Sequence, residues 1–281
     1  MADPSFRLAV IGGGAMARAT LAGGIVAGVI RPADVVVAEP DDACRLALKP
    51  LGVTLVDRAP KALERLDEGG QVLLAVKPQS LDAVAKDIGG ATVRAPVISI
   101  LAGVRSETIR KRLPASGAVV RVMPNLPAQI RKGVSAVALG AGSQPGDEAF
   151  AMRLFGGVGE VVRIDETMMD AFTALAGSGP AYLFYLAEAM VRAGVDMGFD
   201  QATADRVVRG VLQGSGELLA GQREKPPMEM RMAVTSKGGT TEAAVRVLQD
   251  GKFTDLFVRA VVAARNRGAE LAAMHGEPPR Q

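Results

Sequence analysis

The chain has 281 residues, of which 48% are hydrophobic and 22% charged, a composition typical of a globular protein with one large or two medium domains. Lys and Arg exceed Asp and Glu by only 33 to 30 and are scattered along the chain, so no nucleic-acid-binding surface is indicated. Aromatic residues make up 4% of the chain, too few for stacking platforms, and no uninterrupted apolar run reaches membrane-spanning length.

The first part of the chain alternates short β-branched runs with helical patterns. The expected strands are 7–11, 34–39, 71–76, 96–100 and 118–123, with helices near 15–28, 41–50, 79–88 and 105–113 between them. Two more strands, 134–139 and 160–164, flank a helix near 146–155 and complete the sheet. This alternation predicts an α/β fold with a Rossmann-type, doubly wound parallel sheet.

From residue 165 onward the pattern predicts helices only, at 166–176, 180–194, 200–221, 227–235, 240–250 and 254–274. We therefore expect a dinucleotide-binding Rossmann domain at 1–165 and a helical substrate-binding and dimerisation domain at 166–281. The helix that begins at Pro180 is apolar nearly all round, and such a helix must be buried on every side. The helical domain is too small to do this alone, so a partner subunit is expected to cover it.

The segment Ala-Val-Ile-Gly-Gly-Gly-Ala-Met-Ala, residues 9–17, is a candidate dinucleotide-binding turn. It follows a strand, opens a helix and matches Gly-x-Gly-x-x-Ala at Gly12, Gly14 and Ala17. The first glycine permits the turn and the second lets the backbone approach a pyrophosphate, and Ala15 and Met16 are expected cofactor contacts beside it. The alternative is a purely structural glycine turn.

Glu39 ends the second expected strand, close to the spacing at which a carboxylate accepts the ribose hydroxyls of a dinucleotide. The alternative is a solvated carboxylate at a strand end.

Two further loops follow carboxyl ends of strands, where ligands bind in open α/β sheets. The first loop contributes Ala75, Val76, Lys77 and Pro78 as expected cofactor contacts, and the second contributes Asn125. Lys77 either assists the chemistry or is an ordinary exposed loop lysine. Asn125 either contacts the nicotinamide or simply forms a turn.

Residues 234–250 place hydroxyls and a glycine pair directly before an apolar-periodic helix. Ser236, Thr240 and Thr241 offer hydroxyl donors, Gly238 and Gly239 let the backbone amides converge, and the helix adds unpaired N–H groups and a positive dipole end. This segment predicts a cradle for a small carboxylate. The alternative is an ordinary helix start capped by Thr240 or Thr241.

The chain lacks the residues for several kinds of catalysis. Its only histidine, His275, lies among the last residues, so no histidine-based acid, base or metal site is expected. The single Cys44 excludes an internal disulfide, is expected to be inert and, together with the lack of a signal-peptide pattern, predicts a cytoplasmic protein. Cofactor chemistry and substrate positioning then remain, which suits hydride transfer to a C=N bond.

These segments resemble the pyrroline-5-carboxylate reductase family, which makes proline. The resemblance spans nearly the whole chain and rests on the fingerprint at 12–17, Ala-Val-Lys-Pro at 75–78, Met-Pro-Asn at 123–125, Gly-Ser-Gly-Pro-Ala-Tyr at 177–182 and Thr-Ser-Lys-Gly-Gly-Thr-Thr at 235–241. The last of these segments is highly specific for the family.

The resemblance implies hydride transfer from NADH or NADPH to (S)-1-pyrroline-5-carboxylate, the final step of proline biosynthesis. It also implies a helical domain that interlocks with a second subunit, often in a decamer of five dimers. The substrate carboxylate would lie on the loop from Ser236 to Thr241, with the Thr241 hydroxyl near the ring nitrogen as the catalytic group. The alternatives are a reductase of another small cyclic imine or of a hydroxy acid, and a non-catalytic nucleotide-binding protein.

The chain departs from the family pattern at several positions. Lys237 stands where proline is usual, Leu126 where threonine is usual and Ala15 where asparagine is common. Glu39-Pro40 replaces the more typical Asn-Arg or serine-containing turn. A carboxylate at this position would face the 2′-phosphate of NADPH, so the sequence predicts a preference for NADH.

Overall fold

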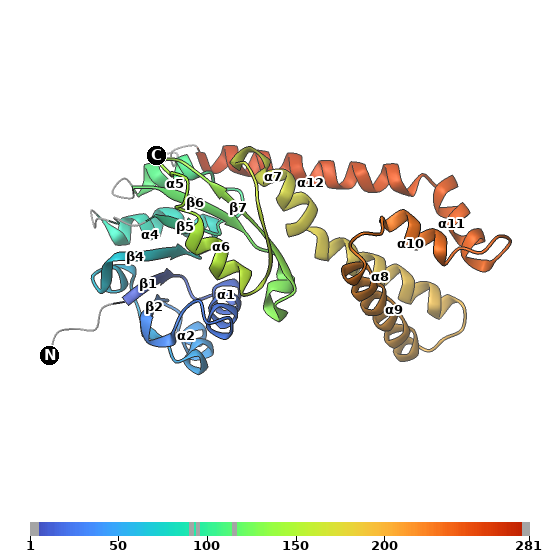
Figure 1. The fold of residues 1–281 in the computed structure, drawn as a ribbon, viewed down its shortest axis with the longest axis horizontal. Helices are drawn as coiled ribbons and strands as arrows, with labels where there is room; N and C mark the ends of the chain where they lie inside the picture. The colour runs from blue at the N-terminus through green and yellow to red at the C-terminus, as the bar shows by residue number, and fades with distance from the viewer. Residues whose placement is uncertain (1–5, 90–92, 94–95, 114–116, 277–281) are drawn as a thin grey trace. The chain divides into compact units, whose positions relative to one another are not determined.

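The computed structural model describes residues 6–89, 93, 96–113 and 117–276. Their contacts divide the chain into two compact units (Figure 1), one formed by the residues up to 178 together with those from 264 onward, and the other by residues 179–263. The last strand ends at Arg163, close to the expected end of the sheet, but the helical turns that follow it belong to the first unit. A functional division at residue 165 stays a prediction.

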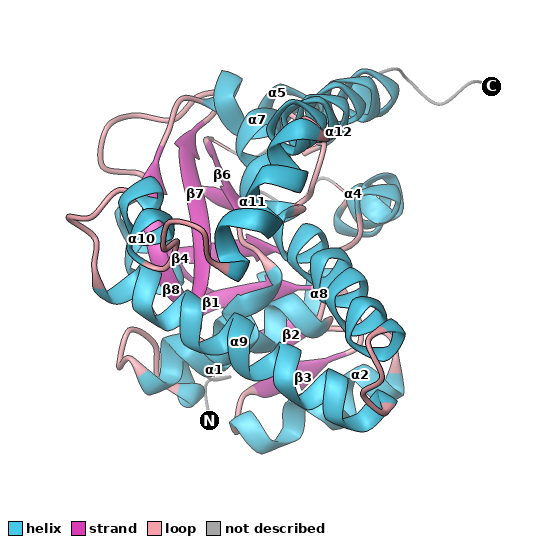
Figure 2. Ribbon diagram, turned by 90° about the vertical axis from the view of Figure 1, so that its right-hand side faces the viewer, coloured by secondary structure: helices cyan, strands magenta, loops and turns pink. Residues whose placement is uncertain are grey.

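The first unit is built on one eight-stranded sheet (Figure 2) in the order β3-β2-β1-β4-β5-β6-β7-β8. The strands are β1 (Phe6–Ile11), β2 (Val35–Ala38), β3 (Thr54–Val56), β4 (Leu66–Leu74), β5 (Val97–Ser99), β6 (Val119–Met123), β7 (Gly133–Leu139) and β8 (Gly159–Arg163). Neighbouring strands pair in parallel except β6 and β7, which are antiparallel. The structure confirms the doubly wound α/β fold and adds one antiparallel pair to it.

Helices cover both faces of this sheet. The helices of this part of the chain are α1 (Ala15–Val26), α2 (Asp42–Leu48), α3 (Ala59–Leu63), α4 (Leu81–Ile88), α5 (Ser106–Arg112), α6 (Ala149–Gly156) and α7 (Met169–Phe172). One apolar cluster joins α1 and α6 to the face that carries Leu8 and Val10, and a second joins α3, α4 and α5 to the face that carries Ala9 and Ile11. Because both faces are buried, the parallel strands read as nearly continuous apolar runs.

The second unit contains α8 (Gly179–Asp196), α9 (Gln201–Gly221), α10 (Pro227–Ala233), α11 (Thr240–Asp250) and the first part of α12 (Phe253–Gly276). Leu183, Phe184 and Tyr185 on α8 are 58%, 56% and 75% exposed, so this chain alone leaves the apolar helix largely uncovered. The rest of α12 belongs to the first unit, where Leu271 lies against Gly103 and Gly268 lies beside Asp170. None of the helices in the described ranges is long and apolar enough to cross a membrane.

Candidate functional site

The turn between β1 and α1 requires glycine at its first position. Gly12 has a φ of 99°, a conformation that residues with a side chain rarely adopt. A Cβ at this position would lie 2.8 Å from the Ala75 carbonyl oxygen and 2.9 Å from Cγ1 of Val76. Two of the segments that the sequence predicts to bind the cofactor therefore meet here, at the carboxyl ends of β1 and β4.

Gly13 and Gly14, which follow Gly12, differ in how closely other atoms approach them. A Cβ at Gly13 would lie 2.6 Å from Cδ1 of Leu48 and 3.1 Å from Glu39, so this glycine lets the turn pack against the β2–α2 region. A Cβ at Gly14 would have no heavy atom within 4 Å among the described residues. Gly14 is also the N-cap of α1, with extended backbone and no side-chain cap, and no acidic residue lies in the first turn. The unpaired amides of α1 and the open face of Gly14 fit an approaching pyrophosphate.

Glu39 is buried, with 9% of its surface exposed, so it is not the solvated carboxylate of the alternative interpretation. Its Oε2 accepts a hydrogen bond from the Gly13 amide at 2.6 Å, and its Oε1 accepts one from the Asp41 amide at 2.9 Å. An ionised carboxylate has about four acceptor positions, so lone pairs remain for ribose hydroxyls. The sequence predicted the position of Glu39 but neither of these bonds, and the bond from Gly13 joins Glu39 to the glycine turn.

Arg45 and Arg58, two arginines that follow β2 in the chain, are already engaged. Arg45 donates from Nη1 to the Glu39 carbonyl oxygen at 2.5 Å and forms an ion pair with Asp42. Arg58 forms an ion pair with Asp87, to which its Nε donates at 3.0 Å. Hydrogen bonding to Asp41, together with burial and nearby negative charge, raises the pKa of the Cys44 thiol, which agrees with an inert cysteine.

The other two loops that are predicted to contact the cofactor differ in burial and in hydrogen bonding: Lys77 is exposed, whereas Asn125 is buried and hydrogen-bonded. Lys77 is exposed at the start of the turn that leads into α4. Asn125 is 8% exposed, donates from Nδ2 to the Ala176 carbonyl at 3.1 Å and accepts at Oδ1 from the Val134 amide at 2.9 Å. Its amide therefore already links β7 to the segment after α7, and one donor and one acceptor position remain for a ligand.

A buried arginine on β6 forms an ion pair with a partly exposed glutamate after β8. Arg121 is 5% exposed and donates from Nη1 to Oε1 of Glu166 at 3.3 Å. Ser106 donates to the same carboxylate from its amide at 2.8 Å and from its hydroxyl at 2.5 Å. Burial lowers the pKa of Arg121, and the charge of Glu166 opposes that shift. These bonds join α5 to the turn after β8 and carry no predicted catalytic role.

The predicted carboxylate cradle lies in the second unit, at the start of α11. Gly238 has a φ of 73°, and a Cβ at Gly239 would collide with Oγ of Ser236, so both glycines are required by the turn. The N-cap residue is Gly239, and no side chain caps the helix. The alternative in which Thr240 or Thr241 caps α11 is therefore wrong. Within the described chain, the Ser236, Thr240 and Thr241 hydroxyls have no hydrogen-bond partner.

Glu242 is a residue of this loop that the sequence analysis missed. Its Oε2 accepts a hydrogen bond from the Gly238 amide at 2.6 Å, which fixes the glycine turn from the first turn of the helix. A Glu three residues after the N-cap position is a sequence signal of a side chain that accepts a backbone N–H group at the helix start. Over the described residues no three His, Cys, Asp or Glu side chains are grouped to hold a metal ion.

Comparison with known proteins identifies both parts of the chain. Residues 166–271 match the family described as pyrroline-5-carboxylate reductase dimerisation, and residues 7–103 match the one described as NADP oxidoreductase, coenzyme F420-dependent. The pyrroline-5-carboxylate reductase of Synechocystis is 39% identical over 267 residues, which cover 95% of this chain and 98% of the relative.

Two solved structures share the fold. A pyrroline-5-carboxylate reductase from Coxiella burnetii superposes with a TM-score of 0.84 at 32% identity, covering 95% of this chain and 99% of its own. A pyrroline carboxylate reductase from Plasmodium falciparum with NADP bound has a TM-score of 0.81 at 23% identity, covering 95% and 98%.

Proposed function

The chain belongs to the pyrroline-5-carboxylate reductase family, and we propose that it reduces (S)-1-pyrroline-5-carboxylate to L-proline, the last step of proline biosynthesis. A bound nicotinamide dinucleotide supplies the hydride. The hydride adds to the imine carbon and a proton adds to the imine nitrogen, so the C=N bond becomes CH–NH. The observation that carries the proposal is the uncapped start of α11, where free hydroxyls and helix amides fit a small carboxylate.

The proposed cofactor site is the strand edge that carries Gly12, Gly14 and Glu39. The amides at the start of α1 and the open face of Gly14 receive the pyrophosphate, with Ala15 and Met16 beside it. The loop from Ala75 to Pro78, which touches Gly12, and the remaining amide positions of Asn125 contact the nicotinamide end.

The proposed substrate site is the loop from Ser236 to Thr241. The substrate carboxylate accepts hydrogen bonds from Ser236, from Thr240 and from the helix amides, where the positive end of the helix dipole favours an anion. Thr241 directs its hydroxyl at the ring nitrogen and assists its protonation. Lys237 is exposed beside this loop and adds positive charge near the carboxylate.

We propose that NADH is preferred over NADPH. The carboxylate of Glu39 stands at the end of β2, where the ribose of a dinucleotide lies, and repels a 2′-phosphate. Pro40 offers no charge to offset this repulsion, and the guanidinium groups of Arg45 and Arg58 are engaged with Asp42 and Asp87.

The chain carries a dimerisation region and self-associates through it. We propose that the exposed apolar side of α8 forms part of the subunit interface and that the assembly is a decamer of five dimers. A cytoplasmic location is part of the same proposal, supported by the single, unpaired Cys44.

The test is a spectrophotometric assay of NADH and NADPH oxidation by the purified protein with pyrroline-5-carboxylate, with proline measured as the product. Saturable turnover to proline, with a larger kcat/KM for NADH, is expected. Parallel assays identify the alternative enzymes: another cyclic imine is tested with the reduced cofactors, and a hydroxy acid is tested with the oxidised cofactors, which would be reduced as the hydroxyl group is oxidised. Absence of turnover with pyrroline-5-carboxylate and either cofactor would overturn the proposed reaction.

A further inference from the structure

The proposed substrate loop begins with a tight turn. The Gly239 amide donates to the Ser236 carbonyl oxygen at 3.0 Å, which closes the turn, and Gly238, its third residue, has a φ of 73°. Lys237, its second residue, is not among the described residues with a positive φ, so the pattern is that of a type II turn. Proline is common at the second position of such a turn because its ring fixes φ there. This chain has lysine instead, so its own backbone does not stiffen the turn in that way.

A side chain of α11 holds the turn instead. Oε2 of Glu242 accepts a hydrogen bond from the Gly238 amide at 2.6 Å. A Glu at this position of a helix usually accepts the amide of the N-cap residue. Here the N-cap residue is Gly239, whose amide is already used within the turn, and Glu242 reaches one residue further back. The carboxylate therefore ties the left-handed residue of the turn to the first turn of the helix.

The same bond keeps the Glu242 carboxylate away from the amides at the start of α11. The backbone N–H groups of Thr240, Thr241 and Glu242 make no hydrogen bond within the described part of the chain, so they are available to a ligand. Glu242 is the acidic residue of this first turn, and its Oε2 is engaged with Gly238. The helix start therefore keeps its free N–H groups for the substrate carboxylate.

We propose that Glu242 is a positioning residue of the substrate loop and that its bond to Gly238 replaces the stiffness that a proline would give to the turn. This role rests on the proposed reductase function. Glu242 does not touch the substrate; it holds the turn so that the helix amides and the Thr241 hydroxyl are in place before the substrate binds. A loop that is ordered in advance costs less free energy on binding than a loop that the ligand must order. Loss of the bond therefore raises KM more than it lowers kcat.

Steady-state kinetics with pyrroline-5-carboxylate compare two substitutions of Glu242. Glu242→Ala removes the acceptor, and its KM is expected to rise about five- to tenfold while kcat stays within about twofold of the wild-type value. Glu242→Gln keeps an acceptor oxygen and is expected to stay within about threefold of the wild-type KM. If Glu242 acted only by repelling the substrate carboxylate, both substitutions would lower KM instead.

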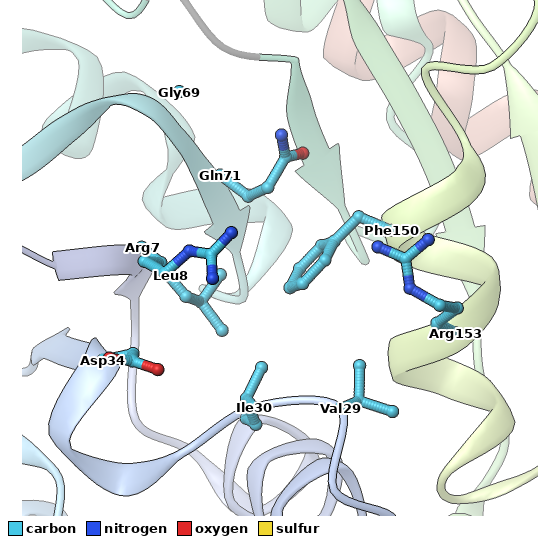
Figure 3. Close-up of a pocket in the computed structure, with 9 residues that line it drawn as sticks. All are labelled: Arg7, Leu8, Val29, Ile30, Asp34, Gly69, Gln71, Phe150 and Arg153. Atoms are coloured by element: carbon cyan, nitrogen blue, oxygen red, sulfur yellow. The ribbon is translucent and has the colours of Figure 1, made fainter.

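Two control variants remove charged side chains outside the proposed sites. Asp250→Ala removes an exposed carboxylate from the last position of α11. Arg153→Ala removes a cation from a pocket of the first unit (Figure 3), where its guanidinium lies 6.0 Å from the centre of the Phe150 ring. Both variants should keep the wild-type KM.

A proline at position 237 tests directly whether Glu242 replaces the stiffness of a proline. Lys237→Pro and Lys237→Ala remove the same charge, and the Lys237 amide makes no hydrogen bond within the described ranges, so the two variants differ mainly in the stiffness of the turn. With Glu242 present, their KM values should agree within about twofold. When each is combined with Glu242→Ala, the proline variant should have a KM about fivefold below that of the alanine variant. Equal KM values in the two double variants would overturn the proposal.

Hydrogen exchange of the ligand-free protein gives a measurement that needs no turnover. The Gly238 amide should exchange at least about fivefold faster in Glu242→Ala than in the wild type, with an unchanged melting temperature, because the amide loses its acceptor and the loop opens locally. Wild-type kinetics in Glu242→Ala, a lower KM in both Glu242 variants, or unchanged exchange at Gly238 would overturn the role of Glu242. A wild-type protein that does not reduce pyrroline-5-carboxylate would refute the reaction itself, whatever the exchange at Gly238 shows.

Discussion

Replacing Glu39 with glutamine separates the two roles assigned to its carboxylate, which are fixing the glycine turn and repelling a 2′-phosphate. Glutamine keeps the size of the side chain and one acceptor oxygen but removes the charge. The hydrogen bond from the Gly13 amide to Oε2, at 2.6 Å, and the bond from the Asp41 amide to Oε1, at 2.9 Å, both have an ionised acceptor. In the variant, an NH₂ group must face one of these two donors.

The size of both effects follows from this geometry. Hydrogen bonds to charged groups contribute about 1.5–3 kcal/mol and neutral ones about 0.5–1.5 kcal/mol, so Glu39→Gln should lower the free energy of unfolding by roughly 2–3 kcal/mol. Removing a unit charge about 6 Å from a phosphate relieves on the order of 1–2 kcal/mol after solvent screening. The ratio of kcat/KM for NADPH to that for NADH should therefore rise by about tenfold.

Urea denaturation measures the first effect, and steady-state kinetics with both cofactors measure the second. Glu64→Gln serves as the control, because it removes one exposed carboxylate from the end of α3 without touching the glycine turn. If the cofactor ratio of Glu39→Gln stays within about twofold of the wild-type ratio, the carboxylate does not face the ribose and the preference for NADH has another cause. An unchanged free energy of unfolding would show that these two hydrogen bonds do not stabilise the fold.

Three further predictions concern the glycine turn, the substrate loop and the assembly. Gly12→Ala should destabilise the fold by roughly 2–4 kcal/mol in urea denaturation, because its Cβ would meet the Ala75 carbonyl at a φ of 99°; Gly14→Ala, which has open space, should fold normally and raise the KM for the cofactor. Equal stabilities of these two variants would contradict this account of the turn. Thr241→Ala should lower kcat/KM by about 10- to 100-fold without changing the melting temperature, and unchanged kinetics would exclude its proposed role. Light scattering should show at least a dimer at micromolar concentration. The Tyr185→Asp substitution, on the exposed side of α8, should shift the protein toward the monomer. A monomeric wild-type protein would refute the proposed assembly.

The strands and helices with strong patterns were predictable, and the shortest elements were not. β3 spans Thr54–Val56 and α3 spans Ala59–Leu63, and neither is long enough to show a periodicity that distinguishes it from a loop. The direction of β7 was missed for another reason. Alternation of strands and helices suggests parallel pairing, but only the short 3-10 turn Leu126–Ile130 joins β6 to β7, and a short connection of this kind is compatible with antiparallel strands.

The glycines that the backbone conformation of the site requires were also predictable from the sequence. Glycines at positions 12, 238 and 239 are required by φ angles or by close approaches, and sequence spacing shows such requirements well. The partners of polar side chains depend on tertiary packing instead. The bond from the Gly13 amide to Glu39 therefore became visible only in the structure.

The path of α12 has a consequence for the order in which the chain folds during synthesis. The chain leaves the first unit after Ser178 and returns to it only at Ala264, in the middle of α12. A ribosome therefore releases the whole sheet, and then all of residues 179–263, before it makes the turns that pack beside Gly103 and Asp170. A nascent chain that stopped at residue 263 would carry every residue assigned to the cofactor and the substrate, yet its first unit would be unfinished.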